Sequence, residues 1–239
     1  MSKFVLVQGA WHGSWCWNRV RRALQALGHD VFTPTLTGLA ERSHLLSREV
    51  NLQTHIDDVA NLIRWQELSN VILCGHSSGG CVISGVADLL PDRIAALVFL
   101  DAFILKGGQC LCDTIPPEAR DGQLALAQQF GEGWRVPPIP AEVFNVNAKD
   151  RAWVDSQCTP QPLAVFQQPI HLRGGFAEIE DISFIRASGW ANSPFLPFYE
   201  QAKANGWKTR EMACGHDVML DQPEALAQEL LSIASLGGH

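Results

Sequence analysis

The 239-residue chain carries 18 Lys and Arg against 25 Asp and Glu, which gives a formal net charge of −7 at pH 7. This acidic balance, without a basic stretch to follow a phosphate backbone, argues against nucleic-acid binding. Hydrophobic residues make up 46% of the chain, enough for a large core, yet no apolar run is long enough for a membrane span or a signal-peptide core. We therefore expect a cytoplasmic protein that binds neither nucleic acid nor membrane.

The cysteines support the same expectation. There are seven of them, an odd number, and they are scattered, several of them inside apolar runs where small buried hydrophobes are common. Cys110-Leu111-Cys112 lacks the two-residue spacing and the second half of a zinc knuckle. We expect reduced thiols and no structural disulfide.

Short apolar runs rich in β-forming residues alternate with longer segments of helical periodicity. Strands are predicted at Phe4–Gln8, Val31–Thr33, Val71–Cys74, Ala95–Leu100, Ile182–Ala187 and Lys208–Met212. Helices are predicted at Trp17–Leu27, Leu52–Gln66, Gly80–Leu90, Phe195–Ala204 and Pro223–Ala234. Continuous apolar strands in alternation with helices are typical of an α/β fold with a parallel sheet covered on both faces. In such folds ligands bind at the carboxyl ends of the strands.

Residues 106–180 break this alternation, between the predicted strand that ends at Leu100 and the one that starts at Ile182. They are rich in proline and show no clear strand, and they are too many for an ordinary loop. Their aromatic residues can anchor packing, as the positions of Trp134, Phe144, Trp153 and Phe166 indicate. We predict a small, mostly helical cap, hereafter the cap segment, inserted into a core formed by residues 1–105 and 181–239. Disorder is the alternative.

The sequence Gly75-His76-Ser77-Ser78-Gly79 connects a predicted strand to a predicted helix. A Gly-x-Ser-x-Gly pattern in this setting is typical of a nucleophile elbow, a sharp turn that holds the serine hydroxyl above the sheet. Glycine is needed on either side because side chains there would collide with the neighbouring strand and helix. We predict Ser77 as a nucleophile, with the backbone N–H of Ser78 as an oxyanion donor. A plain glycine-rich turn is the alternative.

A serine hydroxyl needs a base to accept its proton. Among the eight histidines, His216 follows the last predicted strand and precedes the last helix, where a base can lean over Ser77. His76 lies on the turn itself, where adjacent side chains diverge. Connections, helices or the terminus hold His29, His44, His55, His171 and His239. We predict His216 as the base.

Nearly the whole chain resembles the α/β-hydrolase superfamily. The segment Phe4–Trp17 (FVLVQGAWHGSWCW), the elbow and Gly215-His216 resemble the plant methylesterase and hydroxynitrile lyase branch. Bacterial esterases related to that branch are similar in three further segments: Thr33–Leu45 (TPTLTGLAERSHL), Leu97–Phe103 (LVFLDAF) and Cys214–Ala227 (CGHDVMLDQPEALA). The resemblance implies a sheet of about six parallel strands and suggests a homodimer.

The resemblance also implies a second oxyanion donor. In this family it is a backbone N–H shortly after the first strand, which corresponds to Ala10 here. Family members usually have His-Gly where this chain has Gln8-Gly9.

The triad acid is not in its usual place. In most α/β hydrolases it follows the strand two after the nucleophile, here Ile182–Ala187, but residues 188–194 hold no carboxylate. One strand earlier, Ala95–Leu100 ends in Asp101, the position of the acid in some lipases, and the order Ser…Asp…His is kept. A buried carboxylate needs a partner, and an imidazole supplies one. We predict Asp101 as the acid. A loop-capping role for Asp101 is the alternative, with Asn192, Asp181 or Glu180 in its place.

These residues predict a serine carboxylic-ester hydrolase that acts through an acyl-enzyme on Ser77. We expect small to medium, hydrophobic or aromatic esters as substrates, in contact with Trp11, Trp134, Trp153 and Phe166. No cofactor and no metal are expected, because there is no dinucleotide or phosphate-loop motif and the histidines are not at ligand spacings. A small-molecule ester is thus the expected binding partner.

Other reactions share the fold. The lyases of the branch resemble one another in a threonine shortly after the first strand and a lysine directly after the catalytic histidine, where this chain has Gly9 and Asp217. A carboxylate there would oppose a departing cyanide anion, which disfavours a hydroxynitrile lyase. The same triad also serves C–C bond hydrolases, and the same fold serves non-catalytic ligand receptors, so both of these functions stay open.

Overall fold

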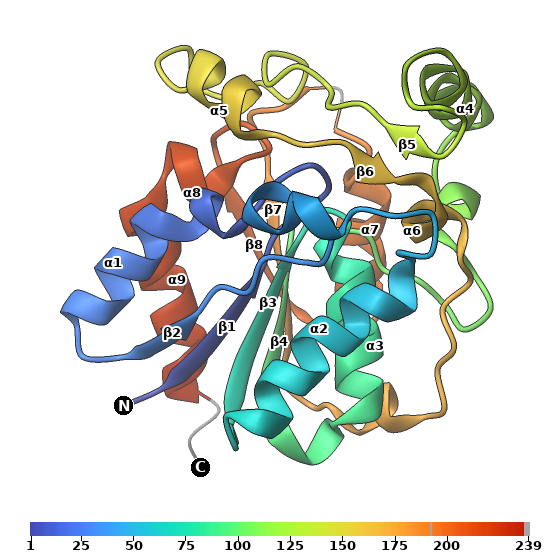
Figure 1. Cartoon of the computed structure of the whole chain (residues 1–239). Helices are drawn as coiled ribbons and strands as arrows, with labels where there is room; N and C mark the ends of the chain where they lie inside the picture. The colour runs from blue at the N-terminus through green and yellow to red at the C-terminus, as the bar shows by residue number, and fades with distance from the viewer. Residues whose placement is uncertain (192, 237–239) are drawn as a thin grey trace.

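The computed structural model describes residues 1–191 and 193–236 (Figure 1). Its main sheet has six parallel strands in the order β2-β1-β3-β4-β7-β8, which confirms the predicted fold class. The strands are β1 (Lys3–Val7), β2 (Asp30–Phe32), β3 (Val71–His76), β4 (Ile94–Leu100), β7 (Ile182–Ala187) and β8 (Lys208–Met212). The predicted third strand is two residues too short, because Gly75 and His76 still pair with Phe99 and Leu100 of β4.

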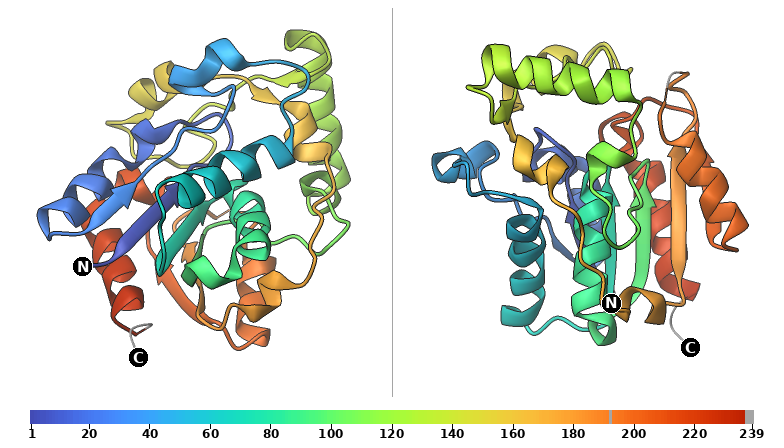
Figure 2. Two further views of the ribbon diagram at one scale, coloured as in Figure 1. Left: turned by 60° about the horizontal axis from the view of Figure 1, so that its bottom comes forward. Right: turned by 90° about the vertical axis from the view of Figure 1, so that its right-hand side faces the viewer.

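Helices cover both faces of this sheet (Figure 2). One face carries α1 (Asn18–Ala26), α8 (Val218–Asp221) and α9 (Pro223–Leu236). The other carries α2 (Leu52–Trp65), α3 (Gly79–Leu89) and α7 (Leu196–Ala204). Within the described residues, no helix is both long and apolar enough to cross a bilayer. All seven cysteines are free thiols.

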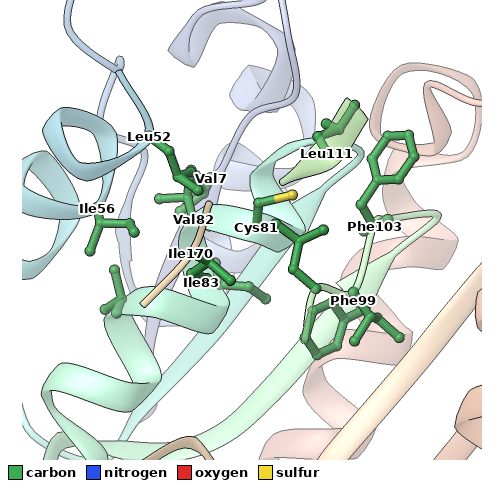
Figure 3. Packing of buried hydrophobic residues seen from close by; sticks show 14 of the residues in the cluster. Val7, Leu52, Ile56, Cys81, Val82, Ile83, Phe99, Phe103, Leu111 and Ile170 are labelled. Atoms are coloured by element: carbon green, nitrogen blue, oxygen red, sulfur yellow. The ribbon is translucent and has the colours of Figure 1, made fainter. Parts of the chain in front are cut away.

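The core is divided by the alternation of side chains along the strands. In β1, Phe4 and Leu6 point to the α1 and α9 side, and Val5 and Val7 point to the α2 and α3 side. Figure 3 shows the second side, where residues of α2 and α3 pack against Val7 and Phe99 from the sheet. Because both faces are buried, the strands read as the continuous apolar runs seen in the sequence.

The cap segment contains α4 (Pro117–Phe130), α5 (Arg151–Gln157) and α6 (Leu163–Gln167). These helices lie over the carboxyl ends of the strands, and the last part of the cap segment runs down beside α3 to the start of β7 (Figures 1 and 2). The cap segment also contains a short antiparallel pair, β5 (Arg135–Val136) and β6 (Gln161–Pro162), although its sequence predicts no strand. Two-residue strands have no periodicity to detect, so the sequence gives no sign of them.

A buried carboxylate ties the end of the cap segment to α3. Asp88 is 7% exposed and accepts hydrogen bonds from the backbone N–H groups of Arg173, Gly174 and Phe176, at 2.6, 2.9 and 3.1 Å. Hydrogen bonds to a charged acceptor are the stronger kind, and a buried N–H left without an acceptor is costly. Asp88 therefore fixes the path by which the chain returns to β7.

Replacement of Asp88 by alanine leaves three backbone donors without this acceptor. We expect Asp88→Ala to lower the free energy of unfolding by about 2 to 4 kcal/mol, measured by urea denaturation. The matched control is Asp92→Ala, at an exposed aspartate close to the end of the same helix. Equal stability of the two variants would contradict this role for Asp88.

Candidate active site

Ser77 occupies a strained turn between β3 and α3. Its φ is 55°, in the left-handed region that non-glycine residues rarely adopt. The turn is tight because backbones approach closely on both sides. A Cβ at Gly75 would lie 2.6 Å from the carbonyl oxygen of Gly79, and one at Gly79 would lie 2.7 Å from that of Gln8. The predicted nucleophile elbow is thus present in geometry, with glycine required at both positions.

Two backbone amides accompany Ser77 at the mouth of the site. Ser78 is the N-cap of α3, so its N–H lies at the positive end of the helix dipole. Ala10 follows β1, and the preceding Gly9 is so close that a Cβ there would lie 2.8 Å from the Cβ of Ser77. Among the described residues, neither amide donates a hydrogen bond to another part of the chain. Both residues line the same cavity as Ser77.

The loop that carries Ala10 is held by the cap segment. Trp11 has a φ of 65°, its backbone N–H donates to Gln161 Oε1 at 3.2 Å, and its indole N–H donates to the carbonyl of Val136 at 3.1 Å. The backbone N–H of Thr159 donates in turn to the carbonyl of Trp11 at 2.9 Å. Thr159 and residues of β5 and β6 therefore fix the loop of residues 9–12, called the oxyanion loop hereafter after the role predicted for Ala10.

His216 and Asp101 form a buried hydrogen-bonded pair. His216 Nδ1 lies 2.7 Å from Asp101 Oδ2, and the other carboxylate oxygen accepts the backbone N–H of Ala187 at 3.1 Å. Asp101 is fully buried and His216 is 4% exposed. Because the carboxylate is an acceptor, the ring hydrogen of a neutral His216 resides on Nδ1, and Nε2 is left free to accept a proton.

Aromatic rings enclose the imidazole of His216. Phe195 stacks on it with the ring planes 9° apart and the centroids 5.0 Å apart. Trp190 and Phe144 pack at 5.1 and 5.5 Å. These contacts restrict the ring to one orientation and exclude water from its faces.

The other candidates for the acid lie elsewhere. Asp181 and Glu180 precede β7 and so lie at the amino ends of the strands, whereas His216 lies at the carboxyl ends. Asp181 pairs with Lys208 at 2.8 Å. Asn192 lies outside the described residues. Asp101 has a φ of 42°, so the chain turns sharply after β4 and carries the carboxylate beneath His216.

A second histidine–aspartate pair lies behind the first, and sequence reasoning missed it. His12 Nε2 is 3.1 Å from Asp217 Oδ2, and both residues are buried. Burial alone lowers the pKa of His12, but the Asp217 carboxylate raises it above its ordinary value. Burial alone raises the pKa of Asp217, but the charge and hydrogen bond of His12 hold it well below its usual range. The only sign of this pair in the sequence is position: His12 lies two residues after the predicted oxyanion donor Ala10, and Asp217 directly follows the predicted base His216.

His76 completes this polar layer. Its Nε2 lies 3.0 Å from the carbonyl oxygen of His216, and its ring is 4.3 Å from that of His216 between centroids. Burial, with the nearby His216, lowers the pKa of His76 well below its ordinary value, so the ring is neutral and donates to the carbonyl. His76 thus supports the loop of His216, and it adjoins Ser77 only at a small cavity of about 10 Å³ behind the main one.

The cavity beside Ser77 has a volume of about 330 Å³ and is walled mainly by apolar side chains. Its walls include Phe103, Leu111, Ile115, Ile139, Phe166 and Phe195. Of the predicted substrate contacts, Trp11 and Phe166 line it. Trp134 and Trp153 do not: Trp134 packs against Arg48 and Arg135, and Trp153 packs against Trp15 and is 38% exposed. The sequence cannot show which face of the cap segment an aromatic residue takes.

One group in the described part of the chain has the spacing of a metal site. His76, His216 and Asp217 offer ligand atoms within 4.8 Å of one another. Asp101 engages His216 Nδ1, and His12 engages an oxygen of Asp217. Within the described residues, His76 Nδ1 and Asp217 Oδ1 are buried without a hydrogen-bond partner. We assign no metal to this cluster.

Comparison with known proteins identifies the family of the chain. The model of a family described as "Alpha/beta hydrolase family" matches residues 4–229. The chain is 43% identical over 248 aligned positions to a carbendazim hydrolyzing esterase of Nocardioides sp. (strain SG-4G), covering 98% of this chain and 100% of that one. It is 38% identical over 107 positions to methylesterase 7 of Arabidopsis thaliana, covering 43% and 40%.

Solved structures are similar over the full length. An extracellular α/β-hydrolase from a Paenibacillus species superposes with a TM-score of 0.85 at 25% identity, over 98% of this chain and 99% of that one. Its description reports structural and functional homology to tobacco salicylic acid binding protein 2.

The Asp101–His216 hydrogen bond generates a prediction. In Asp101→Asn an amide N–H₂ competes for the place of the carboxylate, so the ring tautomer is no longer fixed and an imidazolium is no longer stabilised. We expect kcat for an aryl ester to fall by up to about 10⁴-fold with KM little changed, measured by steady-state kinetics. Asp181→Asn, at the far edge of the sheet, is the control and should retain its activity. Near-normal turnover in Asp101→Asn would show that another group orients His216.

Proposed function

Because the chain belongs to the α/β-hydrolase family, and is a carboxylesterase in the branch of the plant methylesterases, we propose that it cleaves carboxylic esters through an acyl-enzyme on Ser77. One observation carries this proposal. Ser77, on its strained turn, shares a cavity with His216, whose ring is oriented by the buried carboxylate of Asp101.

In the first half of the reaction Ser77 Oγ attacks the ester carbonyl carbon, and its proton passes to His216 Nε2. The carbonyl oxygen becomes an oxyanion, which the N–H groups of Ala10 and Ser78 stabilise. Asp101 stabilises the imidazolium. The tetrahedral intermediate then expels the alcohol, which takes the proton from His216, and the acyl group stays on Ser77.

In the second half a water molecule takes the place of the alcohol. His216 Nε2 accepts its proton while its oxygen attacks the acyl carbon, and the same two amides stabilise the oxyanion. Collapse of this intermediate returns the proton to Ser77 Oγ and releases the carboxylic acid. Water is thus the second substrate of the proposed reaction.

The cavity supports the substrate class. A volume of about 330 Å³ is at the lower end of the range for small-molecule sites, and the walls are apolar and partly aromatic. We propose small to medium esters with a hydrophobic or aromatic group. The name of the Nocardioides relative adds carbendazim to the compounds to be tested.

Asp217 supports hydrolysis over cyanohydrin cleavage. The sequence position after the catalytic base holds this carboxylate, and it is fully buried against His12 and not in the wall of the cavity. The position that directly follows His216 therefore supplies no cation to stabilise a departing cyanide anion.

The first test is a panel of p-nitrophenyl esters with acyl chains of increasing length, together with carbendazim. We expect wild type to hydrolyse the short and medium esters and Ser77→Ala to lose at least about 10³-fold in kcat. A fluorophosphonate probe should label wild type and leave Ser77→Ala unlabelled. Activity that survives in Ser77→Ala would exclude the acyl-enzyme. Tight binding of an ester without turnover or labelling would favour a receptor.

The second test narrows the cavity from the cap segment. Ala119 lines the cavity from α4 and is otherwise exposed, so the fold tolerates a larger side chain there. We expect Ala119→Phe to raise KM for the longer acyl esters by about tenfold, since the new ring takes up their space, and to leave the shortest ester unaffected. Ala125→Phe, at an exposed position of α4 outside the cavity, is the control. An equal change for all chain lengths would place the acyl group elsewhere.

A further inference from the structure

His12 connects the two loops that the proposed reaction needs. Its own loop carries the oxyanion donor Ala10, and its ring contacts Asp217, which directly follows His216. Trp15 stacks on the ring at 5.0 Å between centroids, and His12 is 4% exposed. The side chain is therefore fixed in a dry environment.

Both ring nitrogens of His12 face oxygen acceptors. Nδ1 lies 2.7 Å from the carbonyl oxygen of Ala10, and Nε2 lies 3.1 Å from Asp217 Oδ2. A neutral imidazole carries a hydrogen on only one nitrogen, so its other lone pair would face an oxygen. An imidazolium donates at both nitrogens. A neutral His12 would fit this geometry only opposite a protonated Asp217, and the lowered pKa of Asp217 opposes that form. The geometry and the ionised Asp217 together point to the charged form of His12.

Burial keeps His76, Cys16 and Cys158, which are packed around this pair, uncharged. From β3, His76 is 6.3 Å from His12 between ring centroids, and its lowered pKa keeps it neutral. Burial, with a smaller contribution from the Asp217 charge, raises the pKa of Cys158 to about 12 and that of Cys16 well above its ordinary value. His216 faces the pair from the other side. No other cation among the described residues pairs with Asp217.

We propose that His12 and Asp217 form a buried ion pair that positions the oxyanion loop against the loop of the catalytic base, and that the charge of His12 keeps Asp217 from holding His216 in its protonated form. The two are positioning residues, since neither lines the cavity of about 330 Å³ that is proposed to hold the acyl group. His12 adjoins Ser77 only at a cavity of about 10 Å³, which is too small for an ester. The role in catalysis rests on the function proposed above, whereas the ion pair itself does not.

Loss of the His12 charge should shift the pH dependence of kcat/KM in one direction only. When His12 loses its charge, a second carboxylate beside His216 remains unbalanced, within about 5 Å. A negative charge at that distance favours the protonated imidazole, which cannot accept the proton of Ser77. The acid limb of the kcat/KM profile then moves to higher pH, by at least about one pH unit.

The experiment compares His12→Gln with the double variant His12→Gln/Asp217→Asn. The single variant removes only the cation, so the acid limb should move to higher pH and kcat should fall about 10- to 100-fold as the oxyanion loop shifts, with KM little changed. The double variant removes both charges, so the acid limb should return to its wild-type position even if kcat stays low. His55→Gln, at a buried histidine on α2, is the matched control and should leave the profile unchanged.

A purely structural role for His12 would give a different result. It would lower activity in both variants by the same factor at every pH, without movement of the acid limb, and that outcome would overturn the proposal. Titration with the fluorophosphonate probe counts the folded sites in each preparation, so loss of protein is separated from loss of rate.

A second measurement uses the wild-type protein and does not depend on its activity. In wild type labelled with ¹⁵N-histidine and titrated upward in pH, we expect one imidazole to keep hydrogens on both ring nitrogens after the other histidines have become neutral, because the Asp217 carboxylate raises the pKa of His12. Absence of such an imidazole would overturn the ion pair, whatever the reaction. Its presence in a protein without esterase activity would leave the ion pair standing and reject the proposed function instead.

Discussion

Close backbone packing around Ser77 is the constraint on which the rest of the site depends. The turn is held in a conformation that costs on the order of 1 to 3 kcal/mol, and it persists because neighbouring segments surround it. The Ser77 N–H donates to the carbonyl of Leu100, and its own carbonyl accepts from Phe103. A Cβ at Gly80 would lie 2.3 Å from the carbonyl oxygen of Phe103. The end of β4, which carries Asp101, is therefore positioned by the same contacts that position the nucleophile.

The sequence predicts those features that depend on residues close together in the chain. The sheet, its helices and the elbow depend on short runs of residues, and β3 and α3 lie within two residues of their predicted bounds. Asp101 was also within reach, because a carboxylate at the end of a buried strand demands a partner. The pairing of His12 with Asp217 joins positions 205 residues apart, and no local pattern carries it. Single-sequence reasoning finds the ends of strands but not the contacts between their loops.

In the cap segment, too, the sequence does not predict the contacts of the side chains. Its proline-rich sequence predicts helices and packing anchors but not the direction in which each anchor points. Phe166 faces the cavity, whereas Trp134 and Trp153 lie against arginine and tryptophan side chains on the outside. An amphipathic period would reveal the direction, but short helices joined by irregular chain do not provide one.

The bonds between Trp11 and the cap segment restrict how the enzyme can move. Three hydrogen bonds join this residue to Val136, Thr159 and Gln161, so a rigid outward swing of β5 and β6 would pull apart the loop that carries Ala10. The cover over the site and the oxyanion loop thus behave as one mechanical unit. Helix α4 is joined to β5 by a hydrogen-bonded turn at residues 131–135 and is part of the same unit. Displacement of this cover would therefore also displace the amide of Ala10, so the two proposed oxyanion donors keep their geometry only while the cover is in place.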